Sequence, residues 1–304
     1  MDFSVWPASN RTWAEVADTA VAAERDGWHG VWFADHFMPN VAGTVDADDP
    51  VLEVWSVLSG LAAVTSRVRL GPLVTSVTYR HPAVLAKIAS TTDQISGGRV
   101  VLGIGAGWQV NEHEAYGLEL GDVPTRSDRL EEAAAILRSL LHEPRTTLVS
   151  EFFTVVDAPN EPKSAGSPLP LLVAGKGERR TLRTAARHAD EWNGWCRPDE
   201  MIAKRAVLAR HCEAAGRDVA DLRCSTQAFV CFTDGSAPPS EFLAATTGRP
   251  TLVGTADQIV EQVAAHADAG ADELIVPEWL WDDPAERADH LARFGAEIMS
   301  AFTG

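Results

Sequence analysis

The chain has 304 residues, of which 45% are hydrophobic and 23% charged, an ordinary mixture for a globular protein with a sizeable core. Its formal net charge of -17 argues against nucleic acid or an anionic membrane as the main partner, because both select for basic surfaces. We expect a cytoplasmic protein, since the first residues lack the features of a signal peptide and no apolar run reaches membrane-spanning length. The four cysteines show no metal-ligand spacing, so we expect free thiols and no metal site; they are Cys196, Cys212, Cys224 and Cys231.

Eight apolar runs, each followed by a helix signal, alternate along the chain. They predict strands over residues 3–6, 30–34, 68–75, 100–104, 169–174, 191–195, 222–232 and 274–277. The helix signals include capping boxes that begin at Thr12 and Thr255, a proline at Pro82 and a capping aspartate at Asp283. Eight strand-then-helix units without a break in composition predict an α/β fold, a single (β/α)8 TIM barrel over residues 1–304.

A typical barrel of about 250 residues leaves roughly fifty for insertions, which we expect after strands two, four, five and seven. The loop after strand two reaches Pro50, and the connection after strand four runs from about Gly107 to Asp128. A proline-rich excursion covers residues 142–168, and a Gly- and Pro-rich segment covers 233–254.

Three glycines, Gly103, Gly105 and Gly107, end the fourth strand. Glycines at the carboxyl end of a strand let a flat ligand approach backbone N–H groups, although they can also simply ease packing. Their spacing mimics a dinucleotide-binding fingerprint, which would favour a doubly wound sheet. That fingerprint belongs to the first strand-helix turn with its helix following at once, so we favour the barrel.

In a barrel, the carboxyl ends of the strands and the loops that follow them form the active site. His36 follows the second strand beside Asp35, and it could transfer a proton near neutral pH or only hydrogen-bond its own loop. Asp35-His36 lacks a second histidine at metal-site spacing, and no Gly-x-Ser-x-Gly motif appears, so zinc and serine hydrolysis are disfavoured. Tryptophans at several strand ends favour a flat, conjugated ligand.

A group of basic residues begins the helix after strand five, next to Gly175 and Gly177. It comprises Lys176, Arg179, Arg180 and Arg183. Cations at a helix amino terminus oppose the helix dipole unless an anion lies there. The group therefore indicates either a bound phosphate or a solvated helix face whose charge Glu178 offsets.

At these residues the chain resembles the luciferase-like monooxygenase superfamily, and within it the oxidoreductases that use the deazaflavin coenzyme F420. The resemblance covers nearly the whole length. The matching stretches are Val31–His36, Arg67–Gly71, Thr78–Val84, Ser96–Glu112 and Ala186–Trp192. Relatives with similar strands use FMN instead, so the motifs are less specific for the cofactor than for the superfamily.

The resemblance implies a bacterial-luciferase-like barrel with F420 across its mouth, or FMN as the alternative, and a homodimer. It implies a cis peptide at Leu73-Val74, in a bulge that supports the cofactor. It implies a proton-transfer role for His36. The cofactor contacts that it implies are Asp35 and Ser76 at the ring, Ala106, Gly107 and Asn111 near the ribityl chain, and Gly175, Lys176, Gly177, Glu178 and Arg179 at the phosphate.

One departure concerns the substrate. Trp108 stands where sugar-phosphate dehydrogenases of this superfamily carry an acid, and residues 190–280 hold no clear counterparts of their phosphate-binding cations, which disfavours a phosphorylated sugar. We expect instead a small apolar or aromatic substrate that exchanges a hydride with the deazaflavin C5. The candidate substrate contacts are Trp6, Phe37, Trp108, Trp195 and Trp279. The alternatives are an FMN-dependent monooxygenase and a flavin- or F420-binding protein without catalytic activity.

Overall fold

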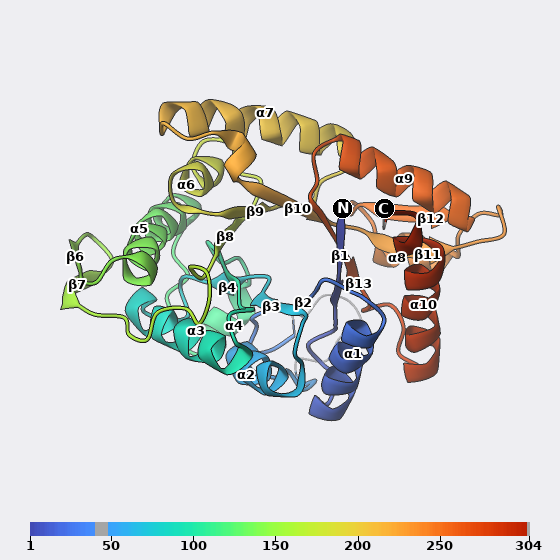
Figure 1. Cartoon of the computed structure of the whole chain (residues 1–304), viewed down its shortest axis with the longest axis horizontal. Coiled ribbons are helices and arrows are strands. Elements are labelled where there is room, and N and C mark those ends of the chain that lie inside the picture. The colour runs from blue at the N-terminus through green and yellow to red at the C-terminus, as the bar shows by residue number, and fades with distance from the viewer. Residues whose placement is uncertain (40–47, 303–304) are drawn as a thin grey trace.

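A computed structural model describes residues 1–39 and 48–302, and it contains a nearly closed parallel β-barrel with helices around it (Figure 1). The barrel strands are β1 (Asp2–Trp6), β2 (Gly30–Phe33), β3 (Arg69–Pro72), β4 (Thr75–Ser76), β5 (Leu102–Gly105), β8 (Leu171–Ala174), β9 (Glu191–Asn193), β10 (Arg223–Gln227) and β13 (Glu273–Pro277). Their order in the sheet is β3-β2-β1-β13-β10-β9-β8-β5-β4. The predicted TIM barrel is confirmed.

The barrel closes between β3 and the residues that lead into β5. The Leu70 N–H donates to the Arg99 carbonyl at 3.0 Å, and the Val101 N–H donates to the Leu70 carbonyl at 2.9 Å. Beyond this point the third predicted strand divides into β3 and β4 around a cis peptide at Leu73-Val74, and β4 pairs with β5.

The eight predicted helices all form, and the predicted caps are present. They are α1 (Trp13–Arg25), α2 (Val54–Val64), α3 (Pro82–Ser96), α5 (Val123–His142), α6 (Thr181–His188), α7 (Pro198–Ala214), α9 (Ala256–Asp268) and α10 (Pro284–Glu297). Thr12 and Thr255 each accept from the backbone of the third helical residue, and Asp283 accepts from Ala285 and Glu286. Among the helices that the structure describes, none has both the length and the apolarity that a membrane crossing needs.

The connections contain more structure than predicted. After β5, a short helix α4 (Val110–Ala115) forms, and α5 begins at Val123, earlier than predicted, because Asp122 caps it through the Thr125 N–H at 2.8 Å. The excursion over 142–168 is an antiparallel hairpin of β6 (Thr146–Val149) and β7 (Thr154–Ala158). It precedes β8 rather than following it, so the insertion expected after the fifth strand lies one connection earlier.

The seventh predicted strand, 222–232, is in fact two strands. After β10 the chain leaves the barrel as β11 (Phe229–Phe232), which pairs in parallel with β12 (Thr251–Gly254). The apolar run continues because β11 is also buried, in this second small sheet. Between them, residues 233–250 contain the short helix α8 (Ser240–Ala245). Residues 40–47 of the loop after β2 lie outside the described residues.

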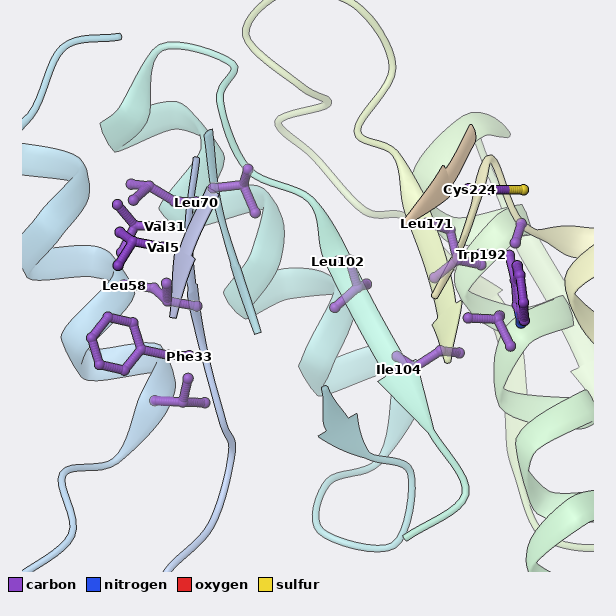
Figure 2. Packing of buried hydrophobic residues seen from close by; sticks show 14 of the residues in the cluster. Val5, Val31, Phe33, Leu58, Leu70, Leu102, Ile104, Leu171, Trp192 and Cys224 are labelled. Atoms are coloured by element: carbon purple, nitrogen blue, oxygen red, sulfur yellow. The ribbon is translucent and has the colours of Figure 1, made fainter. Parts of the chain in front are cut away.

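Two apolar cores hold the barrel together. The larger lies between the strands and the helices: Figure 2 shows Leu58 of α2 beside Val5, Val31 and Phe33 of the neighbouring strands. The smaller fills the barrel interior and comprises Trp6, Trp32, Leu73, Val101, Leu172 and Ile275. The interior is therefore a packed support for whatever lies at its carboxyl end.

Candidate active site

Five partly buried apolar side chains cover the interior core at the carboxyl ends of the strands. They come from four different strand ends and the bulge between β3 and β4, and they are Ala34, Val74, Ala174, Trp195 and Trp279. We call this set the apolar floor. It offers a flat molecule a large contact area with few polar groups to desolvate.

A buried carboxylate holds His36 at the edge of this mouth. His36 Nδ1 lies 2.8 Å from Glu112 Oε1, and the other carboxylate oxygen accepts the Phe37 N–H at 2.8 Å. The Tyr79 hydroxyl also donates to Glu112, whose side chain is fully buried. Because an ionised carboxylate can only accept, Nδ1 is the donor and Nε2 is the nitrogen that can exchange a proton with a bound molecule.

The charge states in this cluster follow from its hydrogen bonds. Burial raises the pKa of Glu112, but hydrogen bonds from His36 and Tyr79 outweigh burial and hold that pKa below its usual value. Burial and the adjacent Glu112 together raise the pKa of the Tyr79 hydroxyl far above its usual value. At neutral pH, Glu112 is therefore ionised and Tyr79 is protonated.

Asp35 takes part in an ion-pair network. Its buried carboxylate pairs with both terminal nitrogens of Arg80, which also donates to Glu53, the N-cap residue of α2, at 2.5 Å. Burial raises the pKa of Asp35, and the Arg80 guanidinium offsets part of that effect. The predicted contact of Asp35 with a cofactor ring stays a prediction, and the carboxylate is engaged with Arg80.

Ser76 and Asn111 both take part in hydrogen bonds within the protein. Ser76 Oγ lies 2.6 Å from Thr78 Oγ1, which lies 2.6 Å from His113 Nε2. Asn111 donates to the Pro39 carbonyl at 2.9 Å, which leaves its buried Oδ1 without a partner among the described residues. An unpaired buried acceptor is costly unless another donor reaches it, so Asn111 Oδ1 can still accept from a bound hydroxyl.

The glycines of β5 make room for the neighbouring bulge. A Cβ at Gly103 would lie 2.2 Å from the Pro72 carbonyl oxygen, and one at Gly105 would lie 2.7 Å from Val74 Cγ2. Gly107 has a φ of +83°, and a Cβ there would lie 2.3 Å from Ser76 Oγ. The packing interpretation of this glycine pattern therefore holds at all three positions, and a ligand is not needed to explain it. Ala106, between two of them, is partly exposed.

Most of the basic group at α6 is neutralised within the protein. Arg180 pairs with Asp128 at 2.7 Å, Arg183 pairs with Glu131 at 2.6 Å, and Lys176 pairs with Glu200 at 3.0 Å. Glu178, proposed to offset this charge, instead pairs with Lys204 at 2.7 Å.

One cation of this group remains. Arg179 is exposed and has no acidic partner in the described part of the chain. It follows Gly175 and Gly177, and no side chain caps the amino terminus of α6. The geometry thus leaves one arginine and an uncapped helix end, both of which can bind an anion.

The five predicted substrate contacts divide into two groups. Trp6, Trp195 and Trp279 contact one another, with ring centroids 4.7 to 6.2 Å apart. Trp108 is 57% exposed and meets the His36 ring edge-on, whereas Phe37 packs against Tyr79 and Tyr116.

A hollow of about 350 Å³ lies elsewhere, against Asp2, Trp28 and Arg67. These residues lie at the opposite end of the barrel, whose residues serve stability rather than catalysis in TIM-barrel enzymes. We therefore assign this hollow no role in the active site.

Sequence reasoning missed four residues at the mouth: Glu112, Tyr79, Arg80 and Arg249. The first three lie inside the stretches that carry the family resemblance, so the signal was present although no role was attached to it. Arg249, whose guanidinium lies over Trp195 and Trp279, had no signal in the sequence.

The fold is a TIM barrel, and the candidate site lies at the carboxyl ends of its strands, where TIM-barrel enzymes carry their active sites. A family model described as luciferase-like monooxygenase matches residues 1–245, and the chain belongs to this family. It is therefore an enzyme of the oxidoreductase class.

Two relatives and one solved structure illustrate the range of the family. The chain is 31% identical over 290 residues to an F420-dependent glucose-6-phosphate dehydrogenase of Kineococcus radiotolerans, which covers 90% of this chain and 81% of the relative. It is 34% identical over 183 residues to the pyrimidine monooxygenase RutA of Cronobacter sakazakii, which covers 58% of this chain and 53% of the relative. An F420-dependent secondary alcohol dehydrogenase, solved with an F420-acetone adduct, aligns with a TM-score of 0.82 over 98% of both chains at 19% identity, a likeness of fold alone.

The residues at the mouth fit a flat cofactor with a phosphate-bearing chain. The part of the apolar floor formed by Ala34, Val74 and Ala174 suits the ring, the unpaired Asn111 Oδ1 suits a hydroxyl of the chain, and Arg179 at the uncapped α6 suits a phosphate. Asn111 Oδ1 and the Arg179 side chain have no partner of their own among the described residues.

Proposed function

We propose that the chain is an F420-dependent oxidoreductase that transfers a hydride between the deazaflavin C5 and a small, apolar or aromatic organic substrate. The observation that carries the proposal is His36, held by Glu112 beside the apolar floor with Nε2 available for proton exchange. The relative from K. radiotolerans, which matches 90% of this chain, is F420-dependent, and this supports the same cofactor.

When bound, F420 supplies a carbon that gives or takes a hydride. The protein's own part is the accompanying proton. His36 Nε2 takes it from, or gives it to, the substrate heteroatom next to the reacting carbon, while Glu112 orients the ring and stabilises its positive charge. The apolar floor limits water at the reacting atoms.

The cofactor is tested by titrating the cofactor-free protein with oxidised F420 and, separately, with FMN, following ligand fluorescence. Tighter binding of F420 is expected. Preference for FMN would favour the second candidate, an FMN-dependent monooxygenase, for which the 34% identity to a pyrimidine monooxygenase speaks. Binding of neither cofactor would contradict both.

The catalytic role is tested with His36→Ala. We expect turnover of a hydride donor or acceptor, found by screening at the deazaflavin absorbance, to fall at least about a hundredfold. The dissociation constant for F420 should stay within about twofold, because the apolar floor and Arg179 remain. Unchanged turnover would refute the proton-transfer role. A homodimer stays a prediction.

A further inference from the structure

Arg249 lies in the insertion after the seventh barrel strand, which the backbone fastens to the mouth. The Phe229 N–H donates to the Pro250 carbonyl at 3.0 Å, and the Arg249 N–H donates to the Thr246 carbonyl at 2.9 Å. Arg197 Nη2 donates to the Arg249 carbonyl at 3.3 Å. The link between α8 and β12 is thus held at the start of β11, where β10 leaves the barrel (Figure 1).

The Arg249 guanidinium lies over aromatic rings. Its central carbon is 5.4 Å from the ring centroid of Trp195 and 5.7 Å from those of Phe229 and Trp279. Trp6 adds a fourth ring, 4.7 Å from Trp279. A cation–π contact involves the face of the guanidinium and does not occupy its N–H donors. These donors point outward in the guanidinium plane and stay available for hydrogen bonds.

Those donors have no acceptor within the part of the chain that the structure describes, and Arg249 is accessible to solvent. Acidic side chains outnumber basic ones in this chain, 43 to 26, yet none of those that the structure describes pairs with Arg249. Arg80 pairs with Asp35 and Glu53, and Arg197 lies 3.9 Å from Glu200. Arg249 is thus a cation at the mouth that packs on aromatic rings and whose guanidinium N–H groups are free to donate.

We propose that Arg249 binds the carboxylate of the substrate, whose apolar or aromatic body lies against Trp195 and Trp279. This rests on the proposed function, because it names the substrate class of the same site. A planar guanidinium matches the two oxygens of a carboxylate, and one fork supplies the charge that a single carboxylate needs. Apart from their indole N–H groups, the surrounding rings offer no partners to the hydroxyls of a sugar, most of which would lose their hydrogen bonds to water on binding.

The test uses two probes with the same ring, 2-naphthoate and its neutral counterpart 2-naphthamide, titrated by calorimetry into the full chain without added cofactor. We expect naphthoate to bind about tenfold more tightly than the amide, as a charge-assisted hydrogen bond allows. Arg249→Gln should abolish the preference, and Arg249→Lys should restore part of it. Arg145→Gln is the matched control, because within the described residues Arg145 pairs only with Asp157 on the β6-β7 hairpin, far from β11 in Figure 1.

Three results would overturn the proposal: equal affinity for both probes, a preference that survives Arg249→Gln while circular dichroism shows a folded variant, or tighter binding of glucose 6-phosphate than of naphthoate. A fourth is a loss of F420 affinity in Arg249→Gln with naphthoate binding unchanged, which would assign Arg249 to the cofactor's own anionic groups. Failure of the proposed function would look different. If the protein binds naphthoate through Arg249 but binds neither cofactor, the carboxylate site stands and the proposed hydride transfer is refuted.

Discussion

Glu112 decides how His36 can act, although it never needs to touch a ligand. Its carboxylate accepts from His36, from the Phe37 N–H and from Tyr79, so three donors from two loops meet at one buried group. A buried anion with this many donors is held in one position, and it fixes which nitrogen of His36 carries the proton. Glu112 is therefore a positioning residue.

Glu112→Gln should lower turnover at least about tenfold while F420 affinity stays within about twofold, because the amide stabilises a neighbouring positive charge far less than the carboxylate does. Nitrogen-15 NMR of His36 gives a readout that general destabilisation would not change: the unaltered protein should show the Nδ1–H form, and the variant a mixture. Glu114→Gln is the control, since Glu114 is exposed on the same helix α4. Retention of the Nδ1–H form in Glu112→Gln would contradict this role.

How far the sequence predicts single residues depends on the distance along the chain between partners. His36 is predictable because it follows a strand, and strand ends meet at the mouth. Its partner Glu112 lies 76 positions away, and no local pattern joins the two. The partners of the basic group at α6 are hidden for the same reason, because Asp128 and Glu131, which neutralise Arg180 and Arg183, belong to α5.

At the scale of elements, caps and contacts between helices and strands determine where each element begins and ends and how it is held to its neighbours. The capping boxes at Thr12 and Thr255 are predictable because each depends on residues three positions apart. The start of α5 is not predictable, since its first residues lack an apolar stripe. The point where β11 leaves the barrel is not predictable either, since β11 continues the apolar run of β10. Glu24 at the end of α1 is another such contact: its carboxylate accepts from the backbone N–H groups of Ser66, Arg67 and Val68, which lead into β3.

Glu24→Gln should lower the free energy of unfolding by about 1 kcal/mol at pH 7, since the carboxylate is partly exposed to solvent. Burial opposes ionisation, but the hydrogen bonds from Arg67, Ser66 and Val68 outweigh it and lower the pKa of Glu24 to about 2. A folded-state pKa below the unfolded value means stability that is complete above about 4.5 and lost as the pH falls toward 2. Urea unfolding should therefore show a smaller difference at pH 3.5 than at pH 7, whereas exposed Glu213→Gln should show almost none at either. An equal difference at both values would mean that the charge of Glu24 is not the cause.

For the whole molecule, the critical line is the seam where the barrel closes between β3 and β5. Counting eight strand-helix units predicts closure but not how the seam is made, because the bulge at Leu73-Val74 depends on how two distant strands approach.

Gly103 permits that approach, since a Cβ there would meet the Pro72 carbonyl, a backbone atom that cannot rotate away. Gly103→Ala should therefore lower the free energy of unfolding by about 3 kcal/mol, as overpacking in a core does. Gly166→Ala, where a Cβ meets nothing within 4 Å, should be close to neutral. Because the seam also supports the apolar floor through Val74, F420 affinity should fall in Gly103→Ala under conditions where the variant is still folded. If thermal unfolding gives the same midpoint for both variants, the seam tolerates a wider spacing and the glycines of β5 need another explanation.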